Sequence, residues 1–148
     1  MESYEVTIGN KTHQVKCVEN LCGHSMERYK IHAGKSVNIV KNQQTTRMVE
    51  GEQYAIETFG STGRGVVYQG PDCSHYMREF NLDKVNVRDK KAMDLYNVIN
   101  REFGTLAFAR KWLEEFYPRH FAPLKKLVDA GIVKDYPPLV DVEGCYTA

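Results

Sequence analysis

The sequence predicts an α+β protein in which short strands come first, helices follow, and a further strand begins near the end. The first third alternates apolar and polar residues between turns, as around Val15 and Cys17, and this is the period of a half-buried strand. The region 92–128 carries apolar residues at helical spacing, and the strand pattern returns at Leu139 and Val140. Separate runs of strands and helices are typical of the α+β class.

Four strands are expected before the helices, at 13–19, 37–40, 54–59 and 74–80. Gly9 and Asn10 predict a turn before the first of them, and the polar run 42–46 predicts a loop after the second.

Three helices are expected after the strands. The first has apolar residues at i, i+3, i+4, i+7 and i+11, with Asp89 as its N-cap and Gly104 at its end. The second covers 108–116 and ends before Pro118. The third covers 124–128, with Gly131 as its C′ residue. The apolar stripe of the first helix consists of Ala92, Leu95, Tyr96, Ile99 and Phe103.

Bulk properties exclude several classes of function. The 148 residues carry a net charge of +1, so no strong field attracts DNA or an anionic membrane. The chain has no run of eighteen apolar residues and no secretory signal at its start. We therefore expect no DNA partner and no membrane partner.

The four cysteines, at positions 17, 22, 73 and 145, contain no C-x-x-C pair. This spacing predicts reduced thiols and a cytoplasmic setting. Cys17, Cys22 and His24 also suggest a zinc knuckle, but no second close pair of ligands follows downstream.

Glu57, His24 and His32 are the first candidates for chemistry. Glu57 lies in a strand with apolar neighbours, where a buried carboxylate is costly unless it is paired or binds a metal; an edge strand facing water is the alternative. In a straight strand, His24 and His32 would lie about 26 Å apart, at about 3.3 Å per residue. They can share a site only if the chain bends. His13 and His120 have no suggestive neighbours and are expected at the surface.

Two segments superficially resemble phosphate-binding loops. Residues 34–36 (Gly-Lys-Ser) lack the upstream glycine of a P-loop, because that position is Tyr29. Residues 60–65 (GSTGRG) do not match the dinucleotide-binding pattern, and a tight turn beside a cleft is the better interpretation. The helical region has the element spacing of a winged-helix unit, but its basic residues are balanced by acidic ones, which favours a packing insertion.

Seven segments in order resemble the type 2 methionine aminopeptidase family over nearly the whole chain. They are NLCGHS at 20–25, IHAGK at 31–35, AIETFGSTG at 55–63, SHY at 74–76, NREFGTL at 100–106, YPPL at 136–139 and GCYTA at 144–148.

The resemblance implies a partial pita-bread fold with a curved antiparallel sheet and a winged-helix-like helical insertion. Residues 1–74 would belong to the C-terminal half of the catalytic domain, 75–138 to the insertion that distinguishes type 2 from type 1 enzymes, and 139–148 to the returning sheet.

It also implies a site with two divalent metals, Co, Mn, Fe or Zn, held by two Asp, one His and two Glu. His24 would be the His ligand, and Glu57 would be a Glu ligand that also relays a proton. His32 would hydrogen-bond the scissile peptide. Ile31, Phe59, His75 and Tyr136 would line the pocket for the methionine side chain.

Only the His ligand and one Glu ligand have counterparts in this chain. The Asp ligands belong to a preceding half of the family's domain, and the second Glu lies just beyond Tyr-Thr-Ala. We therefore expect the isolated chain to bind metals weakly, to hydrolyse nothing and to aggregate or be partly molten. In the family, the substrates are N-terminal methionine peptides and nascent chains.

Two alternatives remain open. One is a non-catalytic binding module of the same fold, of the kind that binds at the ribosome; such relatives typically lack the His and Glu present here. The other is a truncated regulator that competes with the full enzyme for partners.

Overall fold

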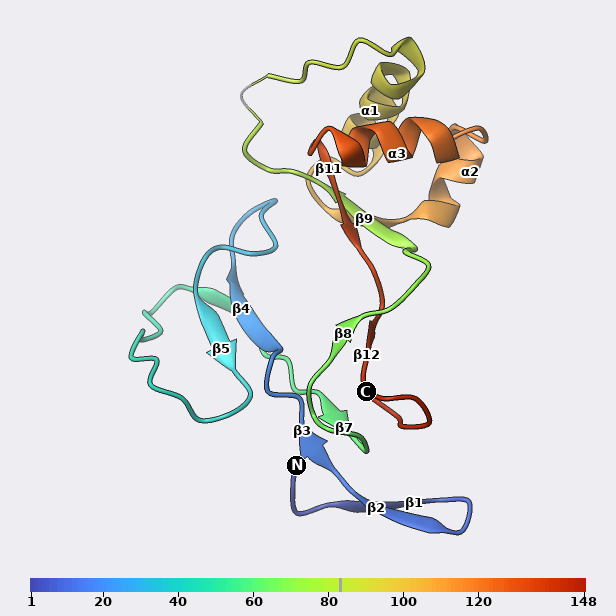
Figure 1. Ribbon diagram of the computed structural model, residues 1–148. Coiled ribbons are helices and arrows are strands. Elements are labelled where there is room, and N and C mark those ends of the chain that lie inside the picture. Colours follow the sequence, from blue (N-terminus) through green and yellow to red (C-terminus); the bar gives the residue numbers. More distant parts are fainter. Residues whose placement is uncertain (83) are drawn as a thin grey trace. The chain divides into compact units, whose positions relative to one another are not determined.

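The computed structural model describes residues 1–82 and 84–148, which form two compact units (Figure 1). Unit 1 comprises Met1–Gly70 and Leu139–Ala148, and unit 2 comprises Pro71–Pro138. Both contain antiparallel strand pairs, and the helices belong to unit 2, so the predicted mixture of helices and antiparallel sheet is confirmed. The ranges 1–74, 75–138 and 139–148 remain a prediction of domain organisation.

Unit 1 begins with a hairpin of β1 (Glu5–Ile8) and β2 (Lys11–Gln14). Gly9 has φ of 61°, the left-handed conformation that a tight hairpin turn requires, and the predicted turn is confirmed. The expected strand 13–19 is interrupted, because β2 ends at Gln14 and β3 (Lys16–Cys17) pairs with a different strand.

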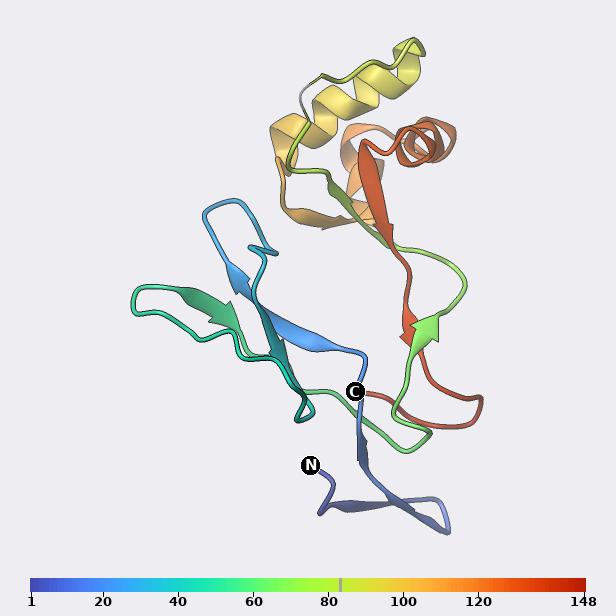
Figure 2. The same cartoon turned by 60° about the vertical axis from the view of Figure 1, so that its left-hand side comes forward.

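The central strand of unit 1 is β4 (Cys22–Met26), which lies between β5 (Ser36–Asn38) and β6 (Gln53–Ala55) (Figure 2). The expected strand 54–59 is also divided. β6 pairs with β4, whereas β7 (Gly60–Ser61) pairs with β3, and 56–59 lie between the two ladders. β8 (Tyr68–Gln69) pairs with β12 (Leu139–Val140), which brings the returning end of the chain into this unit.

Unit 2 is a three-stranded sheet with helices on one side (Figure 1). β9 (His75–Arg78) lies between β10 (Ala107–Ala109) and β11 (Val133–Tyr136). The helices are α1 (Lys90–Glu102), the 3-10 turn η1 (Arg110–Trp112) with α2 (Leu113–Phe116), and α3 (Phe121–Asp129). The spacing of apolar residues predicted α1 and α3. The strands β10 and β11 of this unit, and β8 of unit 1, were not predicted.

Local signals fix the ends of the long helices. The Asp89 carboxylate accepts the Ala92 N–H at 2.9 Å, as an N-cap does. Gly104 has φ of 59° and donates its N–H to the carbonyl of Ile99. Gly131 has φ of 68° and follows the C-cap Ala130. All three predictions are confirmed.

The second predicted helix was wrong at its start. Phe108 lies in β10, opposite Tyr76 of β9, and the chain becomes helical only from Arg110. Phe108 is a core residue, as its spacing to Trp112 and Leu113 suggested. It enters the core from a strand, because β10 forms the edge of the sheet beside β9.

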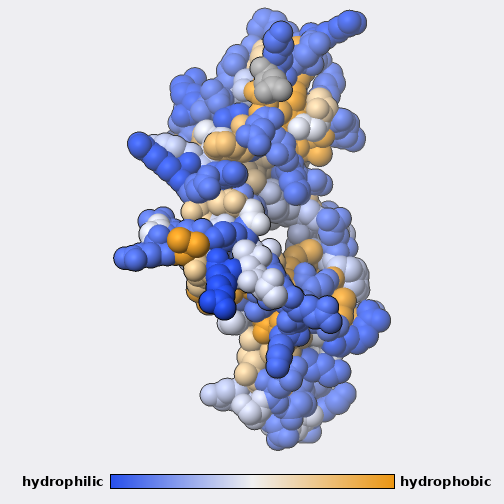
Figure 3. Space-filling model, turned by 90° about the vertical axis from the view of Figure 1, so that its left-hand side faces the viewer, coloured by the Kyte–Doolittle hydropathy of each residue, from blue (hydrophilic) through white to orange (hydrophobic). Residues whose placement is uncertain are grey.

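The hydrophobic core lies in unit 2. It joins one face of α1 and α3 to the inner side of the sheet, and its buried members are Ala92, Leu95, Ile99, Phe108, Leu113, Leu124, Leu127, Ile132 and Val133. In unit 1, Val18 and Val67 are the buried apolar residues among those described. Hydrophilic residues dominate the face that Figure 3 shows, with smaller apolar areas between them. No helix in the described ranges is long and apolar enough to cross a membrane.

The prediction that His120 lies at the surface was wrong. Its side chain is 0% exposed, stacks on Phe121 and places Nδ1 3.1 Å from the carbonyl of Tyr117. Nε2 is buried without a hydrogen-bond partner among the described atoms.

Truncating the core should destabilise unit 2 measurably. Leu95→Ala removes a fully buried side chain from α1 and should cost about 2–5 kcal/mol of unfolding free energy, through lost transfer energy and a cavity. The exposed Leu106 (45%) supplies the control, since Leu106→Ala should change the value by less than about 0.5 kcal/mol. Urea unfolding can be followed by the fluorescence of Trp112, the single tryptophan. Equal effects of the two substitutions would contradict this core.

Candidate functional site

His24 occupies the middle of β4, the best-supported strand of unit 1. It lies opposite Ser36 of β5 and Ala55 of β6, so ladders on both sides fix its backbone. Its side chain is 13% exposed. The sheet therefore fixes the backbone position from which the His24 imidazole extends.

A tight turn brings His32 back to His24. Glu27 and Lys30 exchange two backbone hydrogen bonds of 3.0 Å, and Tyr29 between them has φ of 58°. The Ala33 N–H then donates to the carbonyl of Ser25 at 2.9 Å, which closes the return. The two imidazole centroids lie 4.3 Å apart in an edge contact. The chain therefore bends between His24 and His32, which is the condition for the two residues to share a site.

Glu57 reaches His24 from the neighbouring segment. Ala55 lies directly opposite His24, and Glu57 follows two positions later on the same face of the extended chain. Glu57 Oε1 lies 3.3 Å from His24 Nε2, and the Glu57 side chain is 36% exposed. The segment that carries Glu57 follows an edge strand and the carboxylate is partly exposed, as the alternative expected, but the carboxylate also lies against His24.

Gly23 makes this close approach possible. A Cβ at position 23 would lie 2.2 Å from the carbonyl oxygen of Ala55 and 3.0 Å from the amide nitrogen of Glu57. Both are backbone atoms that cannot move aside without parting the strands. Sequence reasoning missed this residue, although a glycine within a strand often marks a close backbone contact.

Nε2 is the ring nitrogen of His24 that faces Glu57. His24 Nδ1 lies 3.2 Å from the carbonyl of Ser25, which can only accept, so Nδ1 is the donor of that contact. A neutral ring offers the Nε2 lone pair to a metal ion that Glu57 also binds, whereas a protonated ring donates Nε2–H to the Glu57 carboxylate as an ion pair. Metal-ligating histidines typically donate their second N–H to such a carbonyl.

These two donors fit part of a metal site. An imidazole nitrogen and a carboxylate oxygen suit Zn, Mn, Fe or Co. Among the residues described, no group of three or more His, Cys, Asp or Glu side chains could hold a metal. Cys17 and Cys22 are free thiols and form no zinc knuckle with His24.

The other predicted site residues lie in both units. Ile31 and Phe59 are half-buried in unit 1, and the Phe59 carbonyl accepts the Val18 N–H at 2.9 Å. In unit 2, His75 and Tyr136 are direct cross-strand partners on β9 and β11. Desolvation and the charge of Glu79 raise the pKa of Tyr136, so its hydroxyl stays protonated at neutral pH. These placements leave the predicted pocket roles as predictions.

A polar anchor lies beside this site in unit 1. The Glu52 carboxylate accepts from Lys35 Nζ, from the Tyr54 hydroxyl at 2.6 Å and from the Val49 N–H at 2.7 Å. Lys35 also donates to the carbonyl of Arg47. The hydrogen bonds from Lys35 and Tyr54 are the main causes that lower the pKa of Glu52 to about 2.

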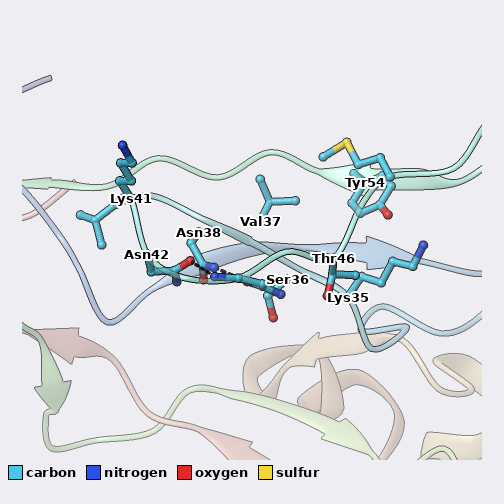
Figure 4. A pocket seen from close by; sticks show the side chains of 11 residues that line it. Lys35, Ser36, Val37, Asn38, Lys41, Asn42, Thr46 and Tyr54 are labelled. Atoms are coloured by element: carbon cyan, nitrogen blue, oxygen red, sulfur yellow. Dashed lines mark hydrogen bonds between the residues drawn. The ribbon is translucent and has the colours of Figure 1, made fainter.

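This anchor ties down the loop that follows β5. The loop covers a hollow of about 310 Å³ (Figure 4). Figure 4 shows Asn38 and Asn42 toward one end of the hollow and Lys35 and Tyr54 toward the other. None of the predicted site residues lines it.

Known proteins match this chain strongly. Methionine aminopeptidase 2 of Schizosaccharomyces pombe is 52% identical over 149 residues, which cover 100% of this chain and 35% of that protein. The chain is a relative of the type 2 methionine aminopeptidases. The Saccharomyces cerevisiae (strain YJM789) enzyme of the same name is 52% identical, and that of Debaryomyces hansenii is 50% identical. The chain spans about a third of the length of these relatives.

A solved structure shares the fold. The structure of a thermophilic Arx1 superimposes with a TM-score of 0.76 over 90% of this chain and 36% of its own, at 16% identity. No protein-family model matches the chain. The relationship to methionine aminopeptidase 2 therefore rests on whole-chain similarity, and the Arx1 likeness concerns the fold alone.

Enlarging the side chain at Gly23 should move the His24 imidazole away from the Glu57 carboxylate. Gly23→Ala should push β4 from Glu57 and change the amide chemical shifts of Ala55 and Glu57 and the side-chain resonances of His24. Ser36→Ala alters the opposite neighbour of His24, at an exposed position, and should leave those signals in place. Unchanged Glu57 and His24 signals in Gly23→Ala would contradict the close approach.

The Glu52 anchor should persist to low pH. Its pKa is depressed from the ordinary 4.5 to about 2, so its stabilising contribution is present above pH 4.5 and is lost as pH falls toward 2. The Val49 amide resonance should report this with a midpoint near pH 2. Tyr54→Phe removes one donor and should move the midpoint to higher pH. A wild-type midpoint at 4.5 would argue against the anchor.

Proposed function

We propose that this chain is a portion of a type 2 methionine aminopeptidase, a two-metal hydrolase that removes the N-terminal methionine from nascent proteins in the cytoplasm. The observation that carries the proposal is the pairing of His24 Nε2 with Glu57 Oε1 at 3.3 Å, which places an imidazole nitrogen and a carboxylate oxygen side by side as two ligands of a metal ion would lie. The whole-chain match to methionine aminopeptidase 2 supports it.

In this proposal His24 and Glu57 hold part of the metal pair. The metals, when bound, supply an activated water and polarise the scissile carbonyl. Glu57 also carries a proton from the attacking water to the leaving amine, a role that its half-exposed carboxylate can serve. The Ser25 carbonyl accepts from Nδ1 of His24, which leaves Nε2 as the nitrogen that faces Glu57 and a metal ion.

His32 positions the substrate peptide. Its ring contacts the edge of His24 and is exposed on the return of the turn, so it can hydrogen-bond a peptide held at the metals. Ile31, Phe59, His75 and Tyr136 select the methionine side chain by apolar contact and shape. The substrates are the N-terminal methionine peptides of nascent chains.

The pairing of 147–148 with 60–61 supports a position for a further ligand. Thr147 lies opposite Ser61, and Ala148 exchanges backbone hydrogen bonds of 2.7 and 3.0 Å with Gly60. A chain continuing in this register would place its third residue past Ala148 opposite Glu57. A second carboxylate supplied there would complete one side of the site.

The fold proposal follows from the same observations. We assign unit 1 to one half of a pita-bread domain and unit 2 to a winged-helix-like insertion. The antiparallel sheets and the likeness to Arx1 support this assignment. The presence of both His24 and Glu57 favours the catalytic function over a non-catalytic binding module.

Metal titration tests the proposal directly. The chain should bind Mn²⁺ weakly, with paramagnetic broadening of the His24 and Glu57 signals, and His24→Ala or Glu57→Gln should each abolish that broadening. His13→Ala, at a distant hairpin position, is the control and should change nothing. Undisturbed His24 and Glu57 signals in the wild-type chain with Mn²⁺ would contradict the metal assignment.

A second measurement separates binding from catalysis. Since two ligands hold a metal poorly, the chain alone should release no methionine from a Met-Ala-Ser peptide with added Co²⁺ or Mn²⁺. Release that depends on Glu57 would show that the site in this chain is complete.

A further inference from the structure

The glycine-rich loop after Glu57 surrounds a buried carboxylate. Asp141, four per cent exposed, follows β12 and is brought to this loop from far along the sequence. Its Oδ2 accepts from the Ser61 hydroxyl and from the Gly65 N–H, both at 2.8 Å. Its Oδ1 accepts from the Val142 N–H at 2.7 Å.

These donors keep Asp141 ionised although it is buried. Desolvation raises the pKa of Asp141, but the Ser61 hydroxyl and the backbone N–H groups of Gly65, Val142 and Arg64 lower it further, to well below its usual range. The Arg64 guanidinium lies 3.9 Å away on a mostly exposed side chain, so its charge contributes less than the directed donors.

Glycines give the loop the shape that this carboxylate needs. A Cβ on Gly63 would lie 2.7 Å from the Asp141 carboxylate and 2.9 Å from Cys145 Sγ. Gly65 has φ of 80°, and a Cβ there would lie 2.6 Å from the carbonyl of Cys17. The run 60–65 therefore encloses the carboxylate of Asp141, to which the Ser61 hydroxyl and the Gly65 N–H donate.

The loop also fixes the end of the segment that carries Glu57. The Ser61 Oγ that donates to Asp141 accepts from the Gly63 N–H at 3.0 Å and lies 3.2 Å from Thr147 Oγ1. Gly60 is paired with Cys17 on one side and with Ala148 on the other. Glu57 lies three residues upstream, so a shift of Gly60 and Ser61 would be transmitted to its backbone.

We propose that Asp141 is a positioning residue for the His24–Glu57 pair, through the loop 60–65 that its carboxylate holds. Asp141 sets where the downstream end of the segment lies, and the ladder of β6 with β4 sets the upstream end. The effect of this positioning on metal binding rests on the proposed function. The contacts of the loop with Asp141 do not depend on that function.

Chemical rescue in the full 148-residue chain tests this proposal. Asp141→Ala should shift the amide signals of Gly65, Phe59 and Glu57 and weaken Mn²⁺ binding about ten- to a hundredfold, as loss of supporting contacts around metal ligands typically does. Added formate, a carboxylate that fits the vacated space, should restore both. Formamide has nearly the same size but no charge and should restore neither.

Two further variants control for folding and for charge. Ser61→Ala removes one donor to Asp141 and keeps the carboxylate, so it should shift the same amides by a smaller amount. This variant replaces Asp141→Ala as the test if Asp141→Ala fails to fold. Glu143→Ala removes an acidic residue from the same segment at an exposed position, and should leave the amides and Mn²⁺ binding unchanged.

The outcomes separate the positioning role from the proposed function. Glu57 and Phe59 amides that stay in place in Asp141→Ala, while the melting temperature falls, would overturn the positioning role. If formamide rescued Asp141→Ala as well as formate does, the loop would not require a negative charge at this position, and the proposed role of the Asp141 carboxylate would be wrong. If the wild-type chain binds no Mn²⁺, the proposed function fails, and formate-dependent return of the Glu57 amide still decides whether Asp141 positions this segment.

Discussion

The extended segment from Gln53 to Ser61 is held at its two ends by different strands, and the geometry of unit 1 depends on this constraint. β6 at its start is hydrogen-bonded to β4, and β7 at its end is hydrogen-bonded to β3. Glu57 lies between these two ladders. Because Gly23 lets β4 approach closely, the first ladder also places the His24 imidazole against the Glu57 carboxylate. The second ladder is completed by Ala148, so the end of the chain is part of the same constraint.

The carboxylates of unit 1 differ in how their charge is met. Asp141 and Glu52 are each surrounded by hydrogen-bond donors, which depress their pKa values and make them structural anchors. Glu57 instead lies 3.3 Å from Nε2 of His24, and its side chain is 36% exposed. A carboxylate enclosed by donors stabilises the fold, whereas a carboxylate that is partly open to solvent beside an imidazole nitrogen can bind a metal ion. This contrast, more than the residue types alone, distinguishes the candidate site from its surroundings.

The two units are stabilised in different ways. Unit 2 has a contiguous apolar core between its helices and its three-stranded sheet. Unit 1 buries few apolar side chains and relies on short ladders and on hydrogen bonds to Asp141, Asn20 and Glu52. Such bonds contribute modestly to net stability, about 0.5–1.5 kcal/mol each. The unit that carries His24 and Glu57 therefore depends more on directed hydrogen bonds than on apolar burial.

The sequence by itself determined the features that depend on neighbouring residues. Asp89, Gly104 and Gly131 mark helix ends because a cap needs only a short polar side chain or a left-handed backbone at one position. The apolar stripe of α1 likewise predicted which residues enter the core. His24, His32 and Glu57 could be named as site residues, but only resemblance to a family connected them, because spacing along the chain says nothing about where the chain turns.

The tertiary structure decided everything that joins distant segments. It bent the chain at Tyr29 so that His32 meets His24. It placed Phe108 in a strand, since a short strand is stabilised by its neighbours rather than by its own sequence. It also gave the glycine-rich loop its anion from Asp141, 76 residues beyond Gly65. A hydrogen bond depends on position in space, and the sequence specifies that position only through the complete fold.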